Sequence, residues 1–462
     1  MALRRLGGRI ILAHGWRRAL IAVAAGATAT LGLAPVDLPV AGFLAFPVLV
    51  WLLDGASGAP GASLLRRLGP AFRVGWCFGF GYFVGGLWWL GAAMLVDAGA
   101  FLWALPLAVL GLPAVLAIYH GLACALARAL WSDGAGRLFA LAGALALAEV
   151  ARGVLFTGFP WNEIGTMAAP APLLMGSVAV VGVHGLTLLA VFAFSLPALL
   201  VGASRGRGWA AAFGIVLVCA HLGIGLWRLQ TVPTGTVEGV TLQVVQPNII
   251  QSEKWDAAEA ERIFATHLRL SEPVPADVPA DPAGRRLVVW PESAFPFVLT
   301  ERPDAVARIA DALGDAETLL AGAVRVEGVG PDERFYNSVY AINGDGAVEA
   351  ASDKLHLVPF GEYLPFQSTL EGLGLTQLTA LPGGFSAGSE RRLIRPAGLG
   401  VSFLPLVCYE IIFPDEIRAD ALDPRPAAIL NVTNDAWYGR TPGPYQHLRQ
   451  AQLSAVALGL LV

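Results

Sequence analysis

The sequence contains little charge, and this shortage excludes most classes of soluble protein. Only 14% of its 462 residues are charged, whereas soluble globular chains carry about 25%. With 55% hydrophobic residues and a mean hydropathy of +0.61, the chain is too apolar for an ordinary soluble enzyme, so we expect membrane-spanning segments. The formal net charge of -4 provides no basic surface for nucleic acid, and we predict no nucleic-acid partner.

Cysteine is also scarce, and its spacing predicts neither a disulfide framework nor a metal site. The four cysteines include no CxxC pair and have no histidines at metal-ligand spacing. Cys77, Cys124 and Cys219 lie in apolar runs, where a thiol behaves as a small hydrophobic side chain. Cys408 differs because its neighbours are polar. It is therefore the cysteine that we single out for chemistry.

The apolar residues are concentrated in the first half of the chain. A spanning helix needs about 20 apolar residues, and about 17 are tolerated. We therefore predict a membrane domain of about seven helices over residues 1–229, followed by a domain of ordinary mixed composition over residues 230–462. The predicted spans are Arg18–Ala34, Leu38–Leu53, Val74–Val96, Phe101–Leu130, Leu138–Phe156, Leu173–Val201 and Trp209–Trp227.

Arginines in alternate connections between these spans predict the orientation of the chain. Several arginines precede the first span and follow the second, fourth and sixth, whereas the connections around Asp37 and Asp97 contain no lysine or arginine. The positive-inside rule then predicts a cytoplasmic N-terminus. Seven spans place everything after Trp227 on the opposite side, which in the inner membrane of a bacterium is the periplasm.

One charged pair lies inside a predicted span. Glu149 and Arg152 are three residues apart, so they can pair on one helix face. Ionisable groups within a span suggest a functional site, but helix capping or helix–helix contact explains them equally well.

The second half of the chain alternates between strand-like and helix-like segments. Buried strands covered by helices indicate a layered α/β domain. We predict strands at Val240–Val245, Leu287–Trp290, Leu319–Val326, Ser338–Ile342, Val401–Val407 and Ala428–Val432, and helices at Ala257–Leu270 and Asp304–Leu313.

Three polar residues in this half suit acyl-transfer chemistry. Glu292, Lys354 and Cys408 each lie where a strand ends, and such ends converge in α/β sheets. A carboxylate can accept a thiol proton, and an ammonium can stabilise both a thiolate and an oxyanion. Taken singly, each has an ordinary interpretation, as a turn carboxylate, a surface lysine and a buried thiol. Their joint occurrence at strand ends favours a catalytic site.

Four strings around these residues resemble a known family. "WPES", "DKLHLVPFGEYLPF", "VCYEIIFP" and "NVTNDAWYG", behind a multi-span region, are similar to apolipoprotein N-acyltransferases of the nitrilase superfamily, over nearly the whole chain. The resemblance implies an αββα sandwich with Glu292 as general base, Lys354 as oxyanion stabiliser and Cys408 as nucleophile. It implies supporting roles for the additional acid Glu362, for the pair Tyr409 and Glu410, and for Trp255 on a mobile loop.

The resemblance also implies a reaction in two steps. Cys408 would take an acyl chain from a phospholipid, such as the sn-1 chain of phosphatidylethanolamine, and hold it as a thioester. The free amine of a diacylglyceryl-cysteine at a lipoprotein N-terminus would then attack. No metal or other cofactor is implied. Both substrates are anchored in the membrane, and tethering beside them raises their effective concentration.

Other interpretations remain open. A membrane-anchored nitrilase-type amidohydrolase would use water as the second nucleophile, although one anchoring helix would suffice for it. A transporter or scaffold with a degenerate domain would not need Glu292, Lys354 and Cys408 intact. Members of the family continue beyond the position of Val462 with more strands and a final span, so we expect a C-terminally incomplete chain. A catalytically impaired fragment is therefore a further alternative.

Overall fold

The computed structural model describes residues 2–59, 61–201, 205–232, 239–273, 285–315, 317–372, 377–379, 383–419 and 425–462. These residues form two compact units. Unit 1 consists of described residues from Met1–Pro233 and Tyr438–Gly459, and unit 2 of described residues from Thr234–Trp437 and Leu460–Val462.

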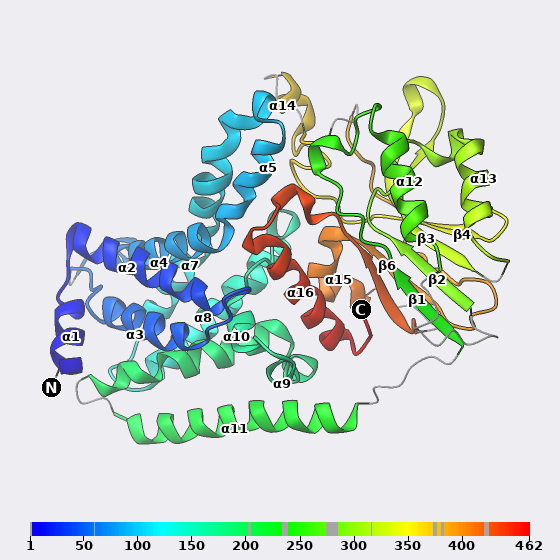
Figure 1. The fold of residues 1–462 in the computed structure, drawn as a ribbon. Coiled ribbons are helices and arrows are strands. Elements are labelled where there is room, and N and C mark those ends of the chain that lie inside the picture. Colours follow the sequence, from blue (N-terminus) through cyan, green and yellow to red (C-terminus); the bar gives the residue numbers. More distant parts are fainter. Residues whose placement is uncertain are drawn as a thin grey trace. The chain divides into compact units, whose positions relative to one another are not determined.

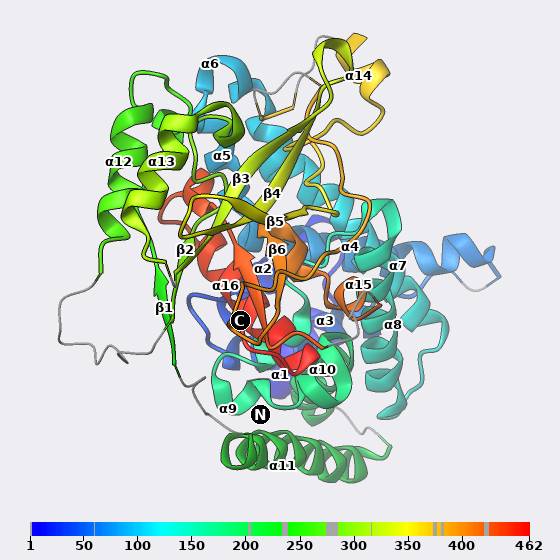
Figure 2. The ribbon, with the colours of Figure 1, turned by 90° about the vertical axis from the view of Figure 1, so that its right-hand side faces the viewer.

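Unit 1 is built from helices, which are labelled in Figures 1 and 2. They are α1 (Ala2–Ile11), α2 (Gly15–Ala29), α3 (Val40–Asp54), α4 (Leu64–Leu87), α5 (Gly91–Val96), α6 (Ala98–Phe101), α7 (Leu112–Ala129), α8 (Gly136–Val154), α9 (Pro172–Met175), α10 (Val178–Ser195), α11 (Arg207–Thr231) and α16 (Pro442–Leu458).

Five helical stretches among the described residues are long and apolar enough to cross a membrane. They overlap the last five predicted spans, which confirms a multi-helix membrane domain. The first predicted span falls in a pair of helices, Ala2–Ile11 and Gly15–Gly32, which are bent by 120° relative to each other. Only the two helices taken together are long and apolar enough to cross a membrane. The second is α3, which has only 15 residues. The number of seven spans and the orientation stay predictions. The five stretches are Leu64–Val96, Ala98–Ala129, Gly136–Thr157, Val178–Leu200 and Arg207–Thr231.

Glycines allow two of these helices to touch backbone to backbone. A Cβ atom at Gly26 of α2 would collide with the carbonyl of Phe78, and one at Gly81 of α4 would collide with the carbonyl of Val23. Small residues are the usual means of close helix packing in membranes, where no hydrophobic effect draws helices together. The contact of α2 with α4 therefore depends on both positions.

The charged pair of α8 holds a loop. The Glu149 carboxylate accepts a hydrogen bond from the backbone N–H of Ile164 at 2.7 Å, and Arg152 donates one to the carbonyl of Trp161 at 2.8 Å. Both side chains are buried, and they are 3.9 Å apart. Buried backbone groups need such partners. These contacts support the capping interpretation, while the hydrogen bond that Thr187 of α10 donates to Glu149 supports helix–helix contact as well.

The helix α16 belongs to unit 1, although it lies in the second half of the sequence, which has an ordinary mixed composition. Its Leu453 joins an apolar cluster with Val178 and Leu186 of α10. Polar contacts accompany this packing: Arg449 donates to both carboxylate oxygens of Asp37 at 3.0 Å, and Gln446 accepts hydrogen bonds from the indoles of Trp89 and Trp161. These contacts group α16 with unit 1, whereas the predicted boundary near residue 229 assigns its residues to the second domain.

Unit 2 contains two sheets. The five strands of the larger sheet lie in the order β1-β2-β3-β4-β5, parallel from β1 to β3 and antiparallel from β3 to β5. The smaller sheet pairs β6 with β7 in parallel. The strands are β1 (Val240–Val244), β2 (Arg285–Trp290), β3 (Thr318–Glu327), β4 (Arg334–Asn343), β5 (Val348–Asp353), β6 (Phe403–Val407) and β7 (Ala428–Val432). The helices are α12 (Ala260–Leu270), α13 (Pro303–Ala312), α14 (Gln367–Gly372) and α15 (Pro414–Ala419).

Side-chain alternation along the central strands separates two apolar layers. On β2, Val288 and Trp290 pack in a core with residues of α12 and α13, whereas Leu287 and Val289 pack in a second core with residues of β6 and β7. Figures 1 and 2 show α12 and α13 on one face of the larger sheet and the smaller sheet on the other. The nitrilase-like α/β sandwich implied by the resemblance is confirmed.

The sequence pattern locates every described strand except β5. The segment Val348–Asp353 reads Val-Glu-Ala-Ala-Ser-Asp and has no apolar run that would predict a strand. It becomes a strand by antiparallel pairing with β4, from Ser338 opposite Asp353 onwards. The pairing partner, not the local propensity, therefore decides this element.

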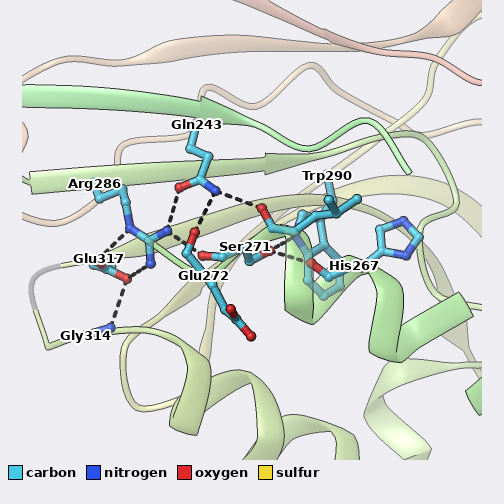
Figure 3. Close-up of polar contacts among 9 residues, drawn as sticks. Gln243, His267, Ser271, Glu272, Arg286, Trp290, Gly314 and Glu317 are labelled. Carbon is cyan, nitrogen blue, oxygen red and sulfur yellow. Dashed lines mark hydrogen bonds and ion pairs between the residues drawn. The ribbon is translucent and has the colours of Figure 1, made fainter. Parts of the chain in front are cut away.

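A partly buried polar network attaches the end of α12 to the larger sheet (Figure 3). Arg286 of β2 forms a two-point ion pair with Glu317 and donates hydrogen bonds to the Gln243 side chain and the Ser271 carbonyl. The Ser271 hydroxyl accepts a hydrogen bond from the indole of Trp290 at 2.7 Å. The guanidinium thus joins β1, β2, the end of α12 and the residue before β3.

We expect Arg286→Met to lower the stability of unit 2 by about 1–3 kcal/mol, because it leaves partly buried acceptors unpaired. Thermal melting of the full chain in detergent would measure the loss.

Arg286 holds the pKa of Glu317 below its usual value, although burial acts in the opposite direction. The ion pair therefore stabilises the fold above the ordinary pKa of a glutamate, and the difference should shrink as acid protonates Glu317. Arg302→Met, at an exposed pair with Asp304, is the control and should change little. Equal melting of both variants would contradict the prediction.

Candidate active site

The three residues predicted to carry chemistry lie at the carboxyl ends of three strands in unit 2. Glu292 follows β2 by two residues, Lys354 directly follows β5, and Cys408 directly follows β6. Lys354 is only 1% exposed and Glu292 9%. The charges of Glu292 and Lys354 both act on the Cys408 thiol. The structure therefore brings the predicted triad together, with Glu292 and Lys354 buried and Cys408 half-buried.

The carboxylate of Glu292 is held by two donors from other strands. Its Oε1 accepts a hydrogen bond from Nδ2 of Asn337 at 2.7 Å, and its Oε2 accepts one from the backbone N–H of Asn434 at 2.9 Å. Asn337 lies in the middle of β4, and Asn434 lies two residues beyond β7. Both sheets therefore fix the orientation of this side chain.

Lys354 is paired with the predicted additional acid. Its ammonium lies 2.7 Å from Oε2 of Glu362. That carboxylate also accepts hydrogen bonds from the backbone N–H of Val358 at 2.8 Å and from the same Asn337 amide at 2.9 Å. Burial acts to lower the pKa of Lys354, but the carboxylates of Glu362 and Glu292 raise it above its usual value. The lysine is therefore an ammonium at neutral pH.

Cys408 occupies a strained backbone position and carries a neutral thiol. Its φ of +54° lies in the left-handed region, which residues other than glycine rarely adopt. Burial raises the pKa of the thiol well above its usual value, and the charge of Glu292 raises it further. Lys354 and a hydrogen bond with Thr433 act in the opposite direction without reversing the shift. The thiol therefore needs a base to become a nucleophile.

The turn that presents Glu292 requires a glycine on the adjacent strand. A Cβ atom at Gly322 of β3 would lie 2.5 Å from the Cα of Glu292 and 2.6 Å from the carbonyl oxygen of Pro291. The Gly322 carbonyl accepts a hydrogen bond from the N–H of Ala294 at 2.8 Å, which closes the turn. Ser293 within it has a φ of +47°. The turn and the strand are therefore in direct backbone contact.

We expect Gly322→Ala to reduce catalysis by about 100-fold, because the added methyl group must displace the Glu292 turn and a misplacement near 1 Å costs about that much. The measurement is the rate at which Cys408 becomes acylated in the reaction that the resemblance implies. Gly372→Ala is the matched control, because a Cβ atom there meets no neighbour within 4 Å. Wild-type rates for the Gly322 variant would contradict the prediction.

Glu410 ties the cysteine turn to the lysine turn. Its Oε2 accepts a hydrogen bond from the N–H of Val407 at 2.8 Å, and its Oε1 accepts one from the N–H of Leu355 at 3.0 Å. Arg391 pairs with the same Oε1 at 3.1 Å, and both side chains are buried. One carboxylate thus holds both the residue before Cys408 and the residue after Lys354.

The other two supporting residues lie in different surroundings. Tyr409 is buried and packs edge-on against the rings of His356 and Phe413, with centroids 5.6 and 5.0 Å away. Trp255 is 48% exposed and directly follows the buried Lys254. Its predicted place on a mobile loop stays a prediction.

Sequence reasoning missed four residues of the site. Asn337 is a polar residue inside an apolar strand, and that anomaly was a usable signal. Asn434 lies in the string "NVTNDAWYG" but had no role assigned. Lys254 adjoins Trp255 and Arg391 lies in a loop, and neither is marked by its local sequence.

Comparison with known proteins supports the resemblance over both halves of the chain. Residues 25–196 match the family model of the apolipoprotein N-acyltransferase N-terminal domain, and residues 241–462 match that of carbon-nitrogen hydrolases. An apolipoprotein N-acyltransferase from Brucella suis biovar 1 (strain 1330) is 54% identical over 460 residues, which cover 99% of this chain and 85% of the relative. The chain belongs to the apolipoprotein N-acyltransferase family.

A further relative fits this assignment. The apolipoprotein N-acyltransferase of Allorhizobium ampelinum (strain ATCC BAA-846 / DSM 112012 / S4) is 52% identical over 461 residues, covering 99% of this chain and 86% of that one. A solved carbon-nitrogen hydrolase from Helicobacter pylori G27 is 15% identical, with a TM-score of 0.30, over 44% of this chain and 66% of that one. The curated relatives and the two family models confirm the predicted family and the predicted class of enzyme, an acyltransferase.

Proposed function

We propose that this chain transfers an acyl chain from a phospholipid to the N-terminal amine of a diacylglyceryl-cysteine lipoprotein, through a thioester on Cys408. The observation that carries the proposal is the arrangement of Glu292, Lys354 and Cys408 in one site. The Asn337 amide in this site donates hydrogen bonds to both Glu292 and Glu362. The names of the relatives supply the lipoprotein as the acceptor class.

In the first half-reaction Glu292 takes the proton of the Cys408 thiol, and the sulfur attacks the ester carbonyl of the phospholipid. The tetrahedral intermediate carries an oxyanion, which Lys354 stabilises. An ammonium has three N–H donors, and Glu362 uses one of them. The C–O bond then breaks, Glu292 returns the proton to the departing alcohol, and a lysophospholipid leaves.

In the second half-reaction the free amine of the lipoprotein attacks the thioester carbonyl. Glu292 accepts a proton from the attacking amine, and Lys354 again stabilises the oxyanion. The C–S bond breaks, the amide forms, and the sulfur recovers its proton. The thioester divides one difficult exchange into two easier steps.

The surroundings of the thiol favour a general-base mechanism over a preformed thiolate. Because burial and Glu292 raise the pKa of Cys408, its proton stays on sulfur until substrate binds. A neutral thiol is less reactive toward stray electrophiles.

We propose that the site faces the periplasm and that both substrates reach it from the inner membrane. The arginine distribution along the apolar half supports this orientation.

The test is the intact mass of the purified chain after incubation with phosphatidylethanolamine, beside a Cys408→Ser control. We expect a fatty-acyl adduct that hydroxylamine removes, on the wild type alone. Adding a diacylglyceryl-cysteine peptide should discharge the adduct and yield an N-acylated peptide. An adduct lost equally fast in water without peptide would instead favour an amidohydrolase. No adduct on a folded chain would overturn the proposal.

A further inference from the structure

Lys254 is a second buried lysine in unit 2 that no step of the mechanism above uses. It lies just after a short helical turn, Gln251–Glu253, and is 8% exposed. Its ammonium donates a hydrogen bond to the backbone carbonyl oxygen of Glu292 at 2.9 Å. A buried lysine costs desolvation free energy, so its position needs an explanation.

The same short turn reaches Glu292 by a second route. The side-chain oxygen of Gln251 accepts a hydrogen bond from Nδ2 of Asn434 at 2.6 Å. The backbone N–H of Asn434 in turn donates to Oε2 of Glu292. The turn thus holds Glu292 at both ends, directly at its peptide carbonyl and through Asn434 at its carboxylate.

We propose that Lys254 is a positioning residue for Glu292: its ammonium fixes the peptide of the base, and the Gln251–Asn434 contact fixes the carboxylate. The inference rests on the proposed role of Glu292 as general base. It assigns to the segment before Trp255 a function in the chemical step.

The charge of Lys254 changes within an accessible pH range. Burial lowers its pKa to about 8, and Glu292 and Cys408 oppose this shift. His267 of α12 also faces it, but burial lowers the pKa of that imidazole to about 4, so it stays neutral above pH 6. Below pH 8 the ammonium donates a charge-assisted hydrogen bond to the Glu292 carbonyl. Above pH 8 the charge is lost, and the carbonyl is held less firmly.

The first half-reaction alone provides the test, since it involves no substrate amine that titrates. We expect Lys254→Met to slow the acylation of Cys408 by phosphatidylethanolamine by about 10- to 100-fold at pH 7, with the KM for lipid unchanged. The wild type should lose rate as pH rises through about 8. Lys254→Arg should acylate without this alkaline loss, because a guanidinium stays charged.

Arg262→Met is the matched control: Arg262 pairs with Glu253 of the same turn, but its side chain is 52% exposed. It should acylate at the wild-type rate, with an unchanged pH profile. Gln251→Leu tests the second route and should also slow acylation, so the inference stays testable if Lys254→Met does not fold.

The inference is overturned if Lys254→Met acylates at the wild-type rate, or if the alkaline loss persists in both Lys254 variants. A wild type that forms no thioester contradicts the proposed function itself. A wild type that forms it, beside Lys254 and Gln251 variants that match it, contradicts only the role of Lys254.

Discussion

Glu292→Gln is expected to slow the acylation of Cys408 by about 10²- to 10⁴-fold, the usual contribution of a general base. The same substitution should make the thiol more acidic, because the Glu292 carboxylate is one of the causes that raise its pKa. Cys408 should therefore react faster with iodoacetamide at pH 8 while transferring acyl groups more slowly. Peptide mass spectrometry resolves this cysteine from the other three, and gives its alkylation rate as a function of pH.

An inactive variant whose thiol titrates as in the wild type would contradict this account, because the carboxylate would then not act on Cys408. Glu301→Gln serves as the control, since that carboxylate is exposed. It should change neither rate. Misfolding would slow transfer but would also expose the buried Cys124 to the reagent, so alkylation of Cys124 distinguishes misfolding from loss of the base.

Lys354→Met is expected to slow acylation by about 10²- to 10³-fold, the typical cost of losing one oxyanion donor. Its effect on the thiol should be opposite to that of Glu292→Gln. The ammonium lowers the pKa of Cys408, so its removal raises that pKa and slows alkylation at every pH below it. Misfolding would not explain two slow variants that shift the pKa of the Cys408 thiol in opposite directions.

The Lys354 variant also leaves the Glu362 carboxylate buried without its cation. Breaking a buried pair in this way costs about 3–5 kcal/mol, so the single variant is expected to melt early in detergent. The double variant Lys354→Met/Glu362→Gln removes both charges and should recover much of the melting temperature. It should stay as slow as the single variant. Recovery of acylation together with stability would contradict an oxyanion role for Lys354.

The local sequence pattern was sufficient to predict the strands that are buried on both faces. The strands β2 and β3 lie between two apolar layers, and so appear in the sequence as continuous apolar runs. The amphipathic helices α12 and α13 cover only one face and show the helical period instead. The strand β5 escaped prediction because its residues are small or charged, and its conformation comes from pairing with β4.

The candidate site was also only partly predictable from the sequence. The positions of Glu292, Lys354 and Cys408 follow from the sequence, because each is attached to a strand end. The contacts between them do not, because they depend on residues far away in the chain. Asn337 bridges Glu292 and Glu362 from the middle of β4, and Gly322 permits the Glu292 turn from the neighbouring strand.

The sequence by itself determined that this is a membrane protein with an α/β domain, and which three residues are candidates for acyl transfer. These properties reside in composition, in periodicity and in short strings, which are local. The tertiary structure decided that α16 packs with the apolar helices of unit 1 and that Lys254 reaches the peptide of Glu292. It also decided that the Cys408 thiol is held neutral. Burial and the fields of neighbouring charges exist only after distant segments have packed together.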